Sequence, residues 1–235
     1  MTCLSIVQTV CQRVGLTSPN SVIGSTDAQI IQMLALLNEE GESLATRHPW
    51  QAITKEASFT TVAAETQGAI STIAPGLDYI INDTIWNRDL RRPIYGPLSK
   101  QRWQQLKAMS MQGPFNQYRI RGDDLIFIPA PVAGQSCYFE YISSHWCSDA
   151  AGSTERGSFA LDDDVGLLDE RLLTLGLIWR WKAAKGFDFT VDLEKYERWV
   201  IEAIGRDGAK DWLNMADNRF DILPAIAIPS GSWNI

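Results

Sequence analysis

Hydrophobic residues near the start of the chain recur at the three- and four-residue spacing of an α-helix. The first stripe runs through residues 3–15 and is closed by Gly15, a residue that favours a helix end. A turn-rich link, LTSPNSVIGSTD, follows, with Ser25 or Thr26 as the expected cap of a second helix. The second stripe ends near HPW, residues 48–50, because a proline forbids a smooth continuation. The apolar positions are Leu4, Val7, Val10, Cys11 and Val14, then Ile30, Met33, Leu34, Leu37 and Leu44.

Between about Trp50 and Trp146 the pattern changes to short β-rich or alternating runs, which are typical of strands. These runs are ASFTTVAA, GAISTI, YIINDTIW, RRPIYG, QYRIRG, DLIFIPA and SCYFEYIS. Two of them, joined through residues 121–124 in RIRGDDLIFIP, predict a β-hairpin. One helix is expected within this region, beginning near Ser99 and continuing through LSKQRWQQLKAM. Residues 148–158, SDAAGSTERGS, show no apolar pattern and indicate a polar loop.

Two further helices are expected after this loop. Asp162 or Asp163 is the predicted start of the first, and Gly186 its stop. Thr190 is the expected cap of the second, and the short GFDFT connection predicts a helical hairpin. The apolar positions of the pair are Val165, Leu168, Leu172, Leu175, Ile178 and Trp179, then Leu193, Tyr196, Val200 and Ile204.

These patterns predict an α+β fold, in which a helical bundle is built from both chain ends around an inserted β-rich region. The wide apolar faces of the first and last helical parts each need a partner, and each can cover the other. The expected divisions are residues 1–52 and 162–215 for the helices, 53–147 for the β-rich region, 148–161 for a linker and 216–235 for an extended C-terminal arm.

The net charge of −7 argues against a general nucleic-acid binder, because neutralising phosphates needs an excess of Lys and Arg. Four cysteines show no metal-ligand spacing and are interpreted as reduced thiols in a protein made in a cytoplasm: Cys3, Cys11, Cys137 and Cys147. The first residues do not have the pattern of a signal peptide, and no apolar run approaches the length of a membrane span.

Motifs that would indicate an enzyme are sparse, and we predict no catalytic, cofactor or metal site. His48 and His145 lie outside metal-binding spacings, and neither a GxSxG elbow nor a phosphate-binding GxxxxGK[ST] loop is present. The acidic run at residues 162–164 is interpreted as a helix start, because three successive side chains on a helix point in different directions. The Arg-Gly-Asp triplet at 121–123 matches a cell-adhesion tripeptide, but it also fits the turn of the predicted hairpin.

The aromatic residues carry more information. Trp179 and Trp181 are two positions apart in a predicted helix, so they lie roughly 200° apart around its axis. A helix lodged against one surface has a single buried stripe, so this helix is expected to pack on two sides. The second side is either the inserted region or another copy of the protein. We therefore name Trp179, Trp181, Arg180 and Lys182 as candidate subunit-interface residues.

The last segment is too apolar for a free tail, and its two prolines exclude a central strand. An extended arm lying in a groove, on its own subunit or on a partner, satisfies both features. The candidate contact residues of this arm are Phe220, Ile222, Leu223, Ile226, Ile228, Trp233 and Ile235.

The order of these elements resembles the head-to-tail adaptor proteins of short-tailed double-stranded DNA phages, which are also called head completion or tail accessory proteins. The matching features are a short helix, a longer helix ending near RHPW (residues 47–50), and the block LLTLGLIWRWKAAKG (residues 172–186). A helix with Tyr196 and Trp199 follows. The likeness covers most of residues 1–210, and the LIWRWKAAKG block is its most specific part. The β-rich content of the middle exceeds that of the more helical members of the family.

The resemblance implies a non-enzymatic virion protein at the head–tail junction, assembled in the host cytoplasm. Its implied partners are the portal protein, tail nozzle or fibre proteins, and other copies of itself in a ring, usually a dodecamer. The resemblance also implies that the C-terminal arm, residues 216–235, binds the portal or a neighbouring adaptor subunit. Genomic DNA would pass through the ring without specific binding, which fits the acidic balance. The alternatives are a tail nozzle or fibre-connecting component, a cell-wall-degrading enzyme of phage entry, and a DNA-binding assembly factor.

Overall fold

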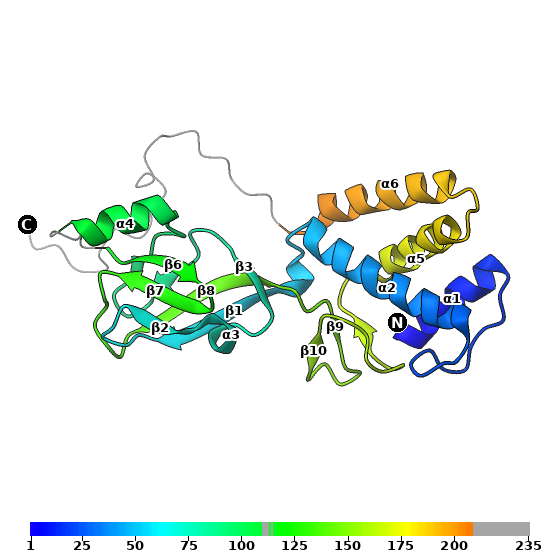
Figure 1. The fold of residues 1–235 in the computed structure, drawn as a ribbon, viewed down its shortest axis with the longest axis horizontal. Helices are drawn as coiled ribbons and strands as arrows, with labels where there is room; N and C mark the ends of the chain where they lie inside the picture. The colour runs from blue at the N-terminus through cyan, green and yellow to red at the C-terminus, as the bar shows by residue number, and fades with distance from the viewer. Residues whose placement is uncertain (110–112, 114, 209–235) are drawn as a thin grey trace, which may run out of the picture.

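The structure, a computed structural model, describes residues 1–109, 113 and 115–208 and confirms a mixed α+β chain (Figure 1). The elements divide along the long axis of the molecule. Helices α1, α2, α5 and α6 lie towards one end, and strands β1 to β8 with α4 lie towards the other. The helices are α1 (Cys3–Val14), α2 (Ala28–Arg47), η1 (Gln51–Ile53), α3 (Ile70–Ile73), α4 (Lys100–Ala108), α5 (Glu170–Ala184) and α6 (Thr190–Arg206).

The first two helices form where the apolar stripes predict them. Helix α1 ends at Gly15, whose φ of 76° gives the left-handed cap that glycine adopts without strain. The cap of α2 is Asp27, not Ser25 or Thr26, and its carboxylate accepts a 2.8 Å hydrogen bond from the Gln29 backbone N–H. Helix α2 ends at Arg47, next to the HPW sequence.

The strands form antiparallel sheets, with β8 at the centre of the largest one. Strand β8 pairs with β1 over the full length of β1, and it also pairs with β3 and β4. A second sheet has the order β2-β7-β6, and its β6–β7 hairpin pairs Arg121 with Asp124, as predicted. The strands are β1 (Thr54–Thr60), β2 (Thr66–Ala69), β3 (Leu77–Ile80), β4 (Trp86–Asn87), β5 (Arg92–Pro93), β6 (Gln117–Arg121), β7 (Asp124–Ile128) and β8 (Ser136–Ser143).

Two local predictions in the β-rich region have different outcomes. Helix α4 begins where expected, because the Ser99 hydroxyl caps it by accepting from the Arg102 backbone N–H. The run GAISTI, expected to be a strand, is extended only to Ala69 and then forms the short helix α3. The Asp123 carboxylate accepts hydrogen bonds from the Ser71 N–H and hydroxyl at the start of this helix. A partner distant in sequence therefore fixes the turn.

The expected helix start near Asp162 is wrong. Three two-residue strands form a small sheet before α5: β9 (Cys147–Ser148), β10 (Glu155–Arg156) and β11 (Val165–Gly166). Helix α5 begins only at Glu170, with the Asp169 carboxylate accepting from the Arg171 N–H at 2.7 Å. The polar loop predicted at 148–158 thus contains short paired segments, which pattern alone does not show.

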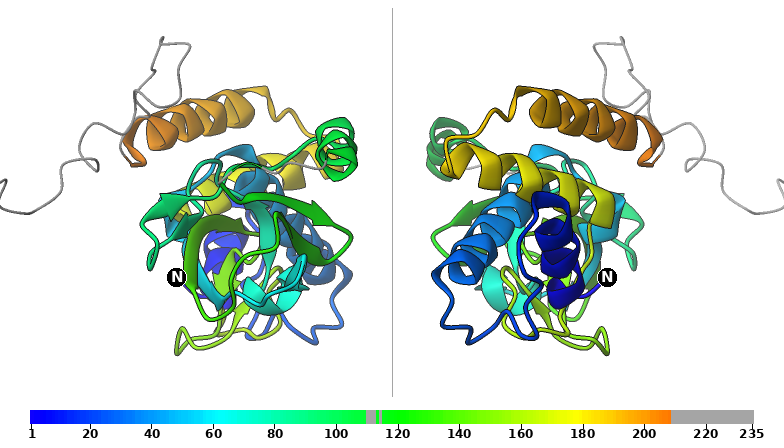
Figure 2. Two further views of the ribbon diagram at one scale, coloured as in Figure 1. Left: turned by 90° about the vertical axis from the view of Figure 1, so that its left-hand side faces the viewer. Right: turned by 90° about the vertical axis from the view of Figure 1, so that its right-hand side faces the viewer.

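Helices α5 and α6 contact each other as an antiparallel pair, and Gly186 between them has a φ of 74° (Figure 2). Thr190 is the first helical residue of α6, so its predicted role as the cap is wrong. Asp188 instead accepts a 3.0 Å hydrogen bond from the Thr190 N–H.

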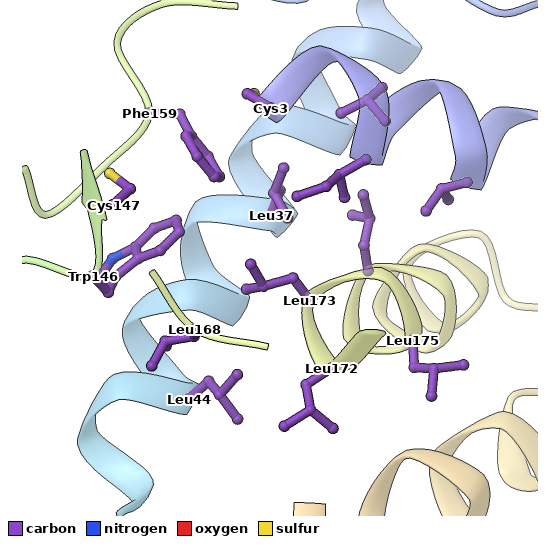
Figure 3. Close-up of a cluster of buried hydrophobic side chains, with 14 of the residues drawn as sticks. Cys3, Leu37, Leu44, Trp146, Cys147, Phe159, Leu168, Leu172, Leu173 and Leu175 are labelled. Carbon is purple, nitrogen blue, oxygen red and sulfur yellow. The ribbon is translucent and has the colours of Figure 1, made fainter. Parts of the chain in front are cut away.

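One hydrophobic core is shared by α1, α2, α5 and α6, so the two chain ends cover each other (Figure 3). Leu37 of α2, Leu173 of α5 and Trp146 before β9 lie together in this core. A separate core lies among the strands and includes Tyr118, Phe127 and Phe139. The domain divisions drawn from the sequence remain a prediction, and the arm at 216–235 lies outside the described residues.

Candidate functional site

Helix α5, which carries the most specific part of the family resemblance, lies at the centre of the helical group. It contacts α1, α2 and α6. Residues 172–178 are all buried, which amounts to about two full turns of helix. A helix enclosed by three others has no single apolar stripe, because every side faces a neighbour.

Both indoles that were expected to lie on opposite sides of α5 are covered by the same chain. Trp181 is 6% exposed and stacks at a tilt on Phe187, with the ring centroids 5.8 Å apart. Trp179 is partly buried, with its ring centroid 6.2 Å from that of Phe189 and 6.1 Å from that of Tyr196. The expectation that the inserted region or another copy supplies the second side was therefore wrong. The second side is supplied by α6 and the turn that leads into it.

The two charged candidates for the subunit interface also have partners within the chain. The Arg180 Nε donates to Glu40 Oε2 at 2.6 Å, and its guanidinium also pairs with Glu39. Lys182 pairs with Asp192 at the start of α6. The packing reason for placing a subunit interface at Trp179, Arg180, Trp181 and Lys182 is thereby removed, because these residues hold the four helices together.

Glu40 is a buried charge that the sequence reasoning missed. Its side chain is 0% exposed and lies against α5 at Gly176, where an added Cβ would come within 2.2 Å of the Glu40 carboxyl carbon. Burial raises the pKa of Glu40, while hydrogen bonds from Arg180 and Tyr196 oppose that rise. Glycine at 176 makes room for the carboxylate, and Arg180 one turn later neutralises it. The spacing of Gly176 and Arg180 has this meaning only once α2 and α5 are known to face each other.

A second polar group fixes the link between the N-terminal helices and α5. Asp162 accepts hydrogen bonds from the Val22 and Ile23 N–H groups at 2.9 and 2.7 Å. Asp164, 1% exposed, accepts 2.7 Å bonds from Arg156 and from the Ala160 N–H. The acidic run therefore ties loops together and does not cap a helix. Within residues 1–109, 113 and 115–208, no group of three or more His, Cys, Asp or Glu side chains is arranged to hold a metal ion.

The four cysteines are reduced and fully buried. Burial raises the pKa of the Cys3, Cys137 and Cys147 thiols to about 12. Thiols with so little thiolate at neutral pH are poor nucleophiles. These side chains therefore serve as core packing.

An open cleft of about 550 Å³ lies on the main sheet and bears on the cell-wall-enzyme alternative. Glu56 and Glu140 face each other there across β1 and β8, beside the aromatic ring of Tyr138. Arg88 pairs with Glu56 and places its guanidinium 3.5 Å over the Tyr138 ring. Both carboxylates are exposed to solvent, so neither lies in the enclosed apolar surroundings that are typical of a glycosidase general acid.

A larger groove, of about 1260 Å³, lies between the helical group and the main sheet. One wall is formed by the end of α6 and the segment after α2, and the other by β3 and its neighbours. The chain leaves α6 at the rim of this groove, where Asp207 accepts a 3.0 Å bond from the Gln51 N–H and lies 3.4 Å from His48 Nε2. The apolar lining residues are Pro49, Leu77, Tyr79, Ile80, Ile81, Pro97, Tyr118, Ile120, Ile201 and Ile204.

None of the helices in the described part of the chain has the length and apolar character needed to cross a membrane. Among known proteins, no family model matches this sequence, and no curated protein matches it.

Proposed function

We propose that this chain is a non-enzymatic structural protein of a tailed-phage virion, an adaptor that forms a ring beneath the portal. In this role it connects the head to the tail and extends the DNA channel. Its partners would be the portal protein, tail nozzle or fibre proteins, and other copies of itself. The acidic balance, a net charge of −7, supports a channel through which DNA passes without adhering.

The observation that carries the proposal is the position of residues 172–186, the block on which the family resemblance is most specific. Most of this block lies within α5, the enclosed centre of the core shared by both chain ends. Because most of these residues are buried and pack the core, their resemblance to the adaptor family supports a shared fold and not a shared catalytic mechanism. It supports the finer fold proposal of a helical bundle from both chain ends, an inserted β-rich region, and an arm at 216–235.

Copies in the proposed ring must meet through surfaces other than the side of α5 that carries Trp179 and Trp181. Two exposed apolar residues lie at the α5–α6 turn, Phe187 at 57% and Val191 at 72% exposure. Apolar side chains left in water favour association, so we place the contact with a second copy at this turn.

The test of the proposal is to mix the purified protein with portal particles and image the mixture by electron microscopy. We expect ring-shaped density on the tail-facing end of the portal. Portal particles that stay bare at saturating protein would refute the adaptor proposal. Density attached below an adaptor ring of another protein would instead identify a nozzle or fibre-connecting component.

Truncation after Met215 tests the arm. The described core residues end at Val200, so the shortened chain is expected to fold but to lose attachment to portals. A full-length variant with residues 216–235 scrambled controls for nonspecific adhesion of apolar side chains. Attachment by the truncated chain equal to that of the full chain would contradict the arm assignment.

A cell-wall-degrading enzyme is the alternative of a different class, and the sheet cleft is where its carboxylates would lie. A zymogram on cell-wall substrate, with Glu56→Gln and Glu140→Gln as matched variants, tests it. Clearing by the parent protein that both variants abolish would favour the enzyme over the adaptor.

A further inference from the structure

The groove between α6 and the main sheet exposes apolar side chains that a free protein is expected to cover. On the helical wall Ile201 is 67% exposed, and on the sheet wall Tyr79 is 45% exposed. These two residues come from elements that are far apart in the sequence, so the groove exists only in the folded chain. Apolar surface gathered in a concave site favours a bound partner.

The size and edge of the groove point to a polypeptide segment as its occupant. Its volume of about 1260 Å³ exceeds the roughly 300–1,000 Å³ that is typical of small-molecule pockets. Strand β3, which lines it, pairs with β8 on one side, and no other strand in the described part of the chain pairs with it. An exposed strand edge beside an apolar groove is a usual site for an extended peptide.

The described part of the chain ends at the rim of this groove. Asp207 lines the groove, and its carboxylate is held by the Gln51 N–H, so the end of α6 is anchored at the rim. Residues 209–235 follow directly and contain ILPAIAI at 222–228, a run without a charged side chain. From Gly208 to Ile222 an extended chain spans up to roughly 45 Å, which is ample to return along the groove.

We propose that the groove is the docking site of residues 222–228 of the same chain. The run matches the apolar part of the lining and carries no acidic side chain that the lining carboxylates of Asp78, Asp83, Glu140 and Asp207 would repel. Pro224 is compatible with the outer edge of a sheet. Tethering at the rim gives the segment an effective concentration of about 1 mM. A second copy at micromolar concentration would compete poorly, so docking within one chain is favoured. This inference concerns the free chain and does not depend on the proposed phage function, in which the portal would displace the segment from the groove.

The test is a disulfide between the helical wall and the arm in the full-length protein, using Ile201→Cys with Ile226→Cys. Ile201 is exposed, so its replacement should not disturb folding. The native cysteines are fully buried, so they should not interfere with mild oxidation. We expect a disulfide within one chain, seen as a faster monomer band without reductant and as a 201–226 link in peptide mapping.

The matched control is Val191→Cys with Ile226→Cys. Val191 is on the same helix and is as exposed as Ile201, 72% against 67%, but it lies about 15 Å away along the axis. The link to position 201 should form at least tenfold faster than the link to position 191. Equal rates of the link within one chain at the two positions would overturn the proposal. So would the absence of any link in the Ile201→Cys/Ile226→Cys variant, or a disulfide-linked dimer of that variant.

Discussion

Helix α2 lies in very close contact with the Trp146 indole at Gly41. A Cβ added there would lie 2.3 Å from Cη2 and Cζ2 of the Trp146 indole. This indole is 1% exposed and packs edge-on against Phe159, with the ring centroids 4.9 Å apart. A contact of this length is far inside normal packing distance, so Gly41→Ala must displace either the helix or the ring.

The expected size of the effect is a balance of two terms with opposite signs. Overpacking a close-packed core costs about 1–3 kcal/mol. Replacing glycine by alanine within a helix stabilises the helix by up to about 1 kcal/mol, because alanine has the higher helix propensity. Because the ring is enclosed and more than 1 Å of movement is needed, the first term lies near its upper end. We expect Gly41→Ala to lower the free energy of unfolding by about 2 kcal/mol.

Thermal unfolding followed by circular dichroism measures this difference. For a chain of this length, 2 kcal/mol corresponds to a fall in Tm of about 4–8 °C. Gly205→Ala is the matched control, since Gly205 lies in α6 and an added Cβ would have no atom within 4 Å. The control should keep or raise Tm. If Gly41→Ala behaves like the control, the close packing of α2 on Trp146 is refuted.

Two further predictions concern charged groups. Arg180→Met leaves buried Glu40 without its cation and should lower the free energy of unfolding by about 3–5 kcal/mol. Lys182→Met removes a partly exposed ion pair with Asp192 and should lower it by less than about 1 kcal/mol. Equal losses of unfolding free energy for the two variants, measured by urea unfolding, would contradict this. Asp162→Asn should destabilise by about 1–2 kcal/mol at pH 7. Burial raises the pKa of Asp162, but hydrogen bonds to its carboxylate outweigh burial, so the pKa in the folded state is lowered. The stability that this carboxylate contributes is therefore complete above its unfolded pKa of about 3.9, and it is lost as the pH falls through the folded pKa. A mutant difference that persists unchanged at pH 2 would disprove it.

Elements encoded by adjacent residues could be predicted from the sequence. Helix α1 and its Gly15 cap, the hairpin joined at residues 121–124, and α4 with its Ser99 cap form where expected. In each case the residues that specify the turn, cap or helix lie within a few positions of the structure that they form. Local backbone preference and capping therefore suffice.

Features that depend on distant partners could not be predicted. Asp162 bonds to the link between α1 and α2, so the acidic run does not start a helix. Residues 70–73 are β-rich in composition but turn into a helix where Asp123 bonds to Ser71. Glu40 lies on the apolar face of its helix, between Leu37 and Leu44, but the groups that accommodate its carboxylate, Arg180 and Gly176, are identified only by the packing of α2 against α5. Similarly, the 1260 Å³ groove has no sequence signal, because its walls come from segments that are far apart in the sequence.

The sequence by itself determined that α5 needs cover on opposite sides, since Trp179 and Trp181 cannot share one stripe of a helix. The tertiary structure decided what supplies that cover: α6, the turn before it and α2, all from the same chain. The physical reason is that the hydrophobic effect is non-directional. An apolar side chain specifies that it must leave water, but only the packing of the whole chain specifies which surface receives it.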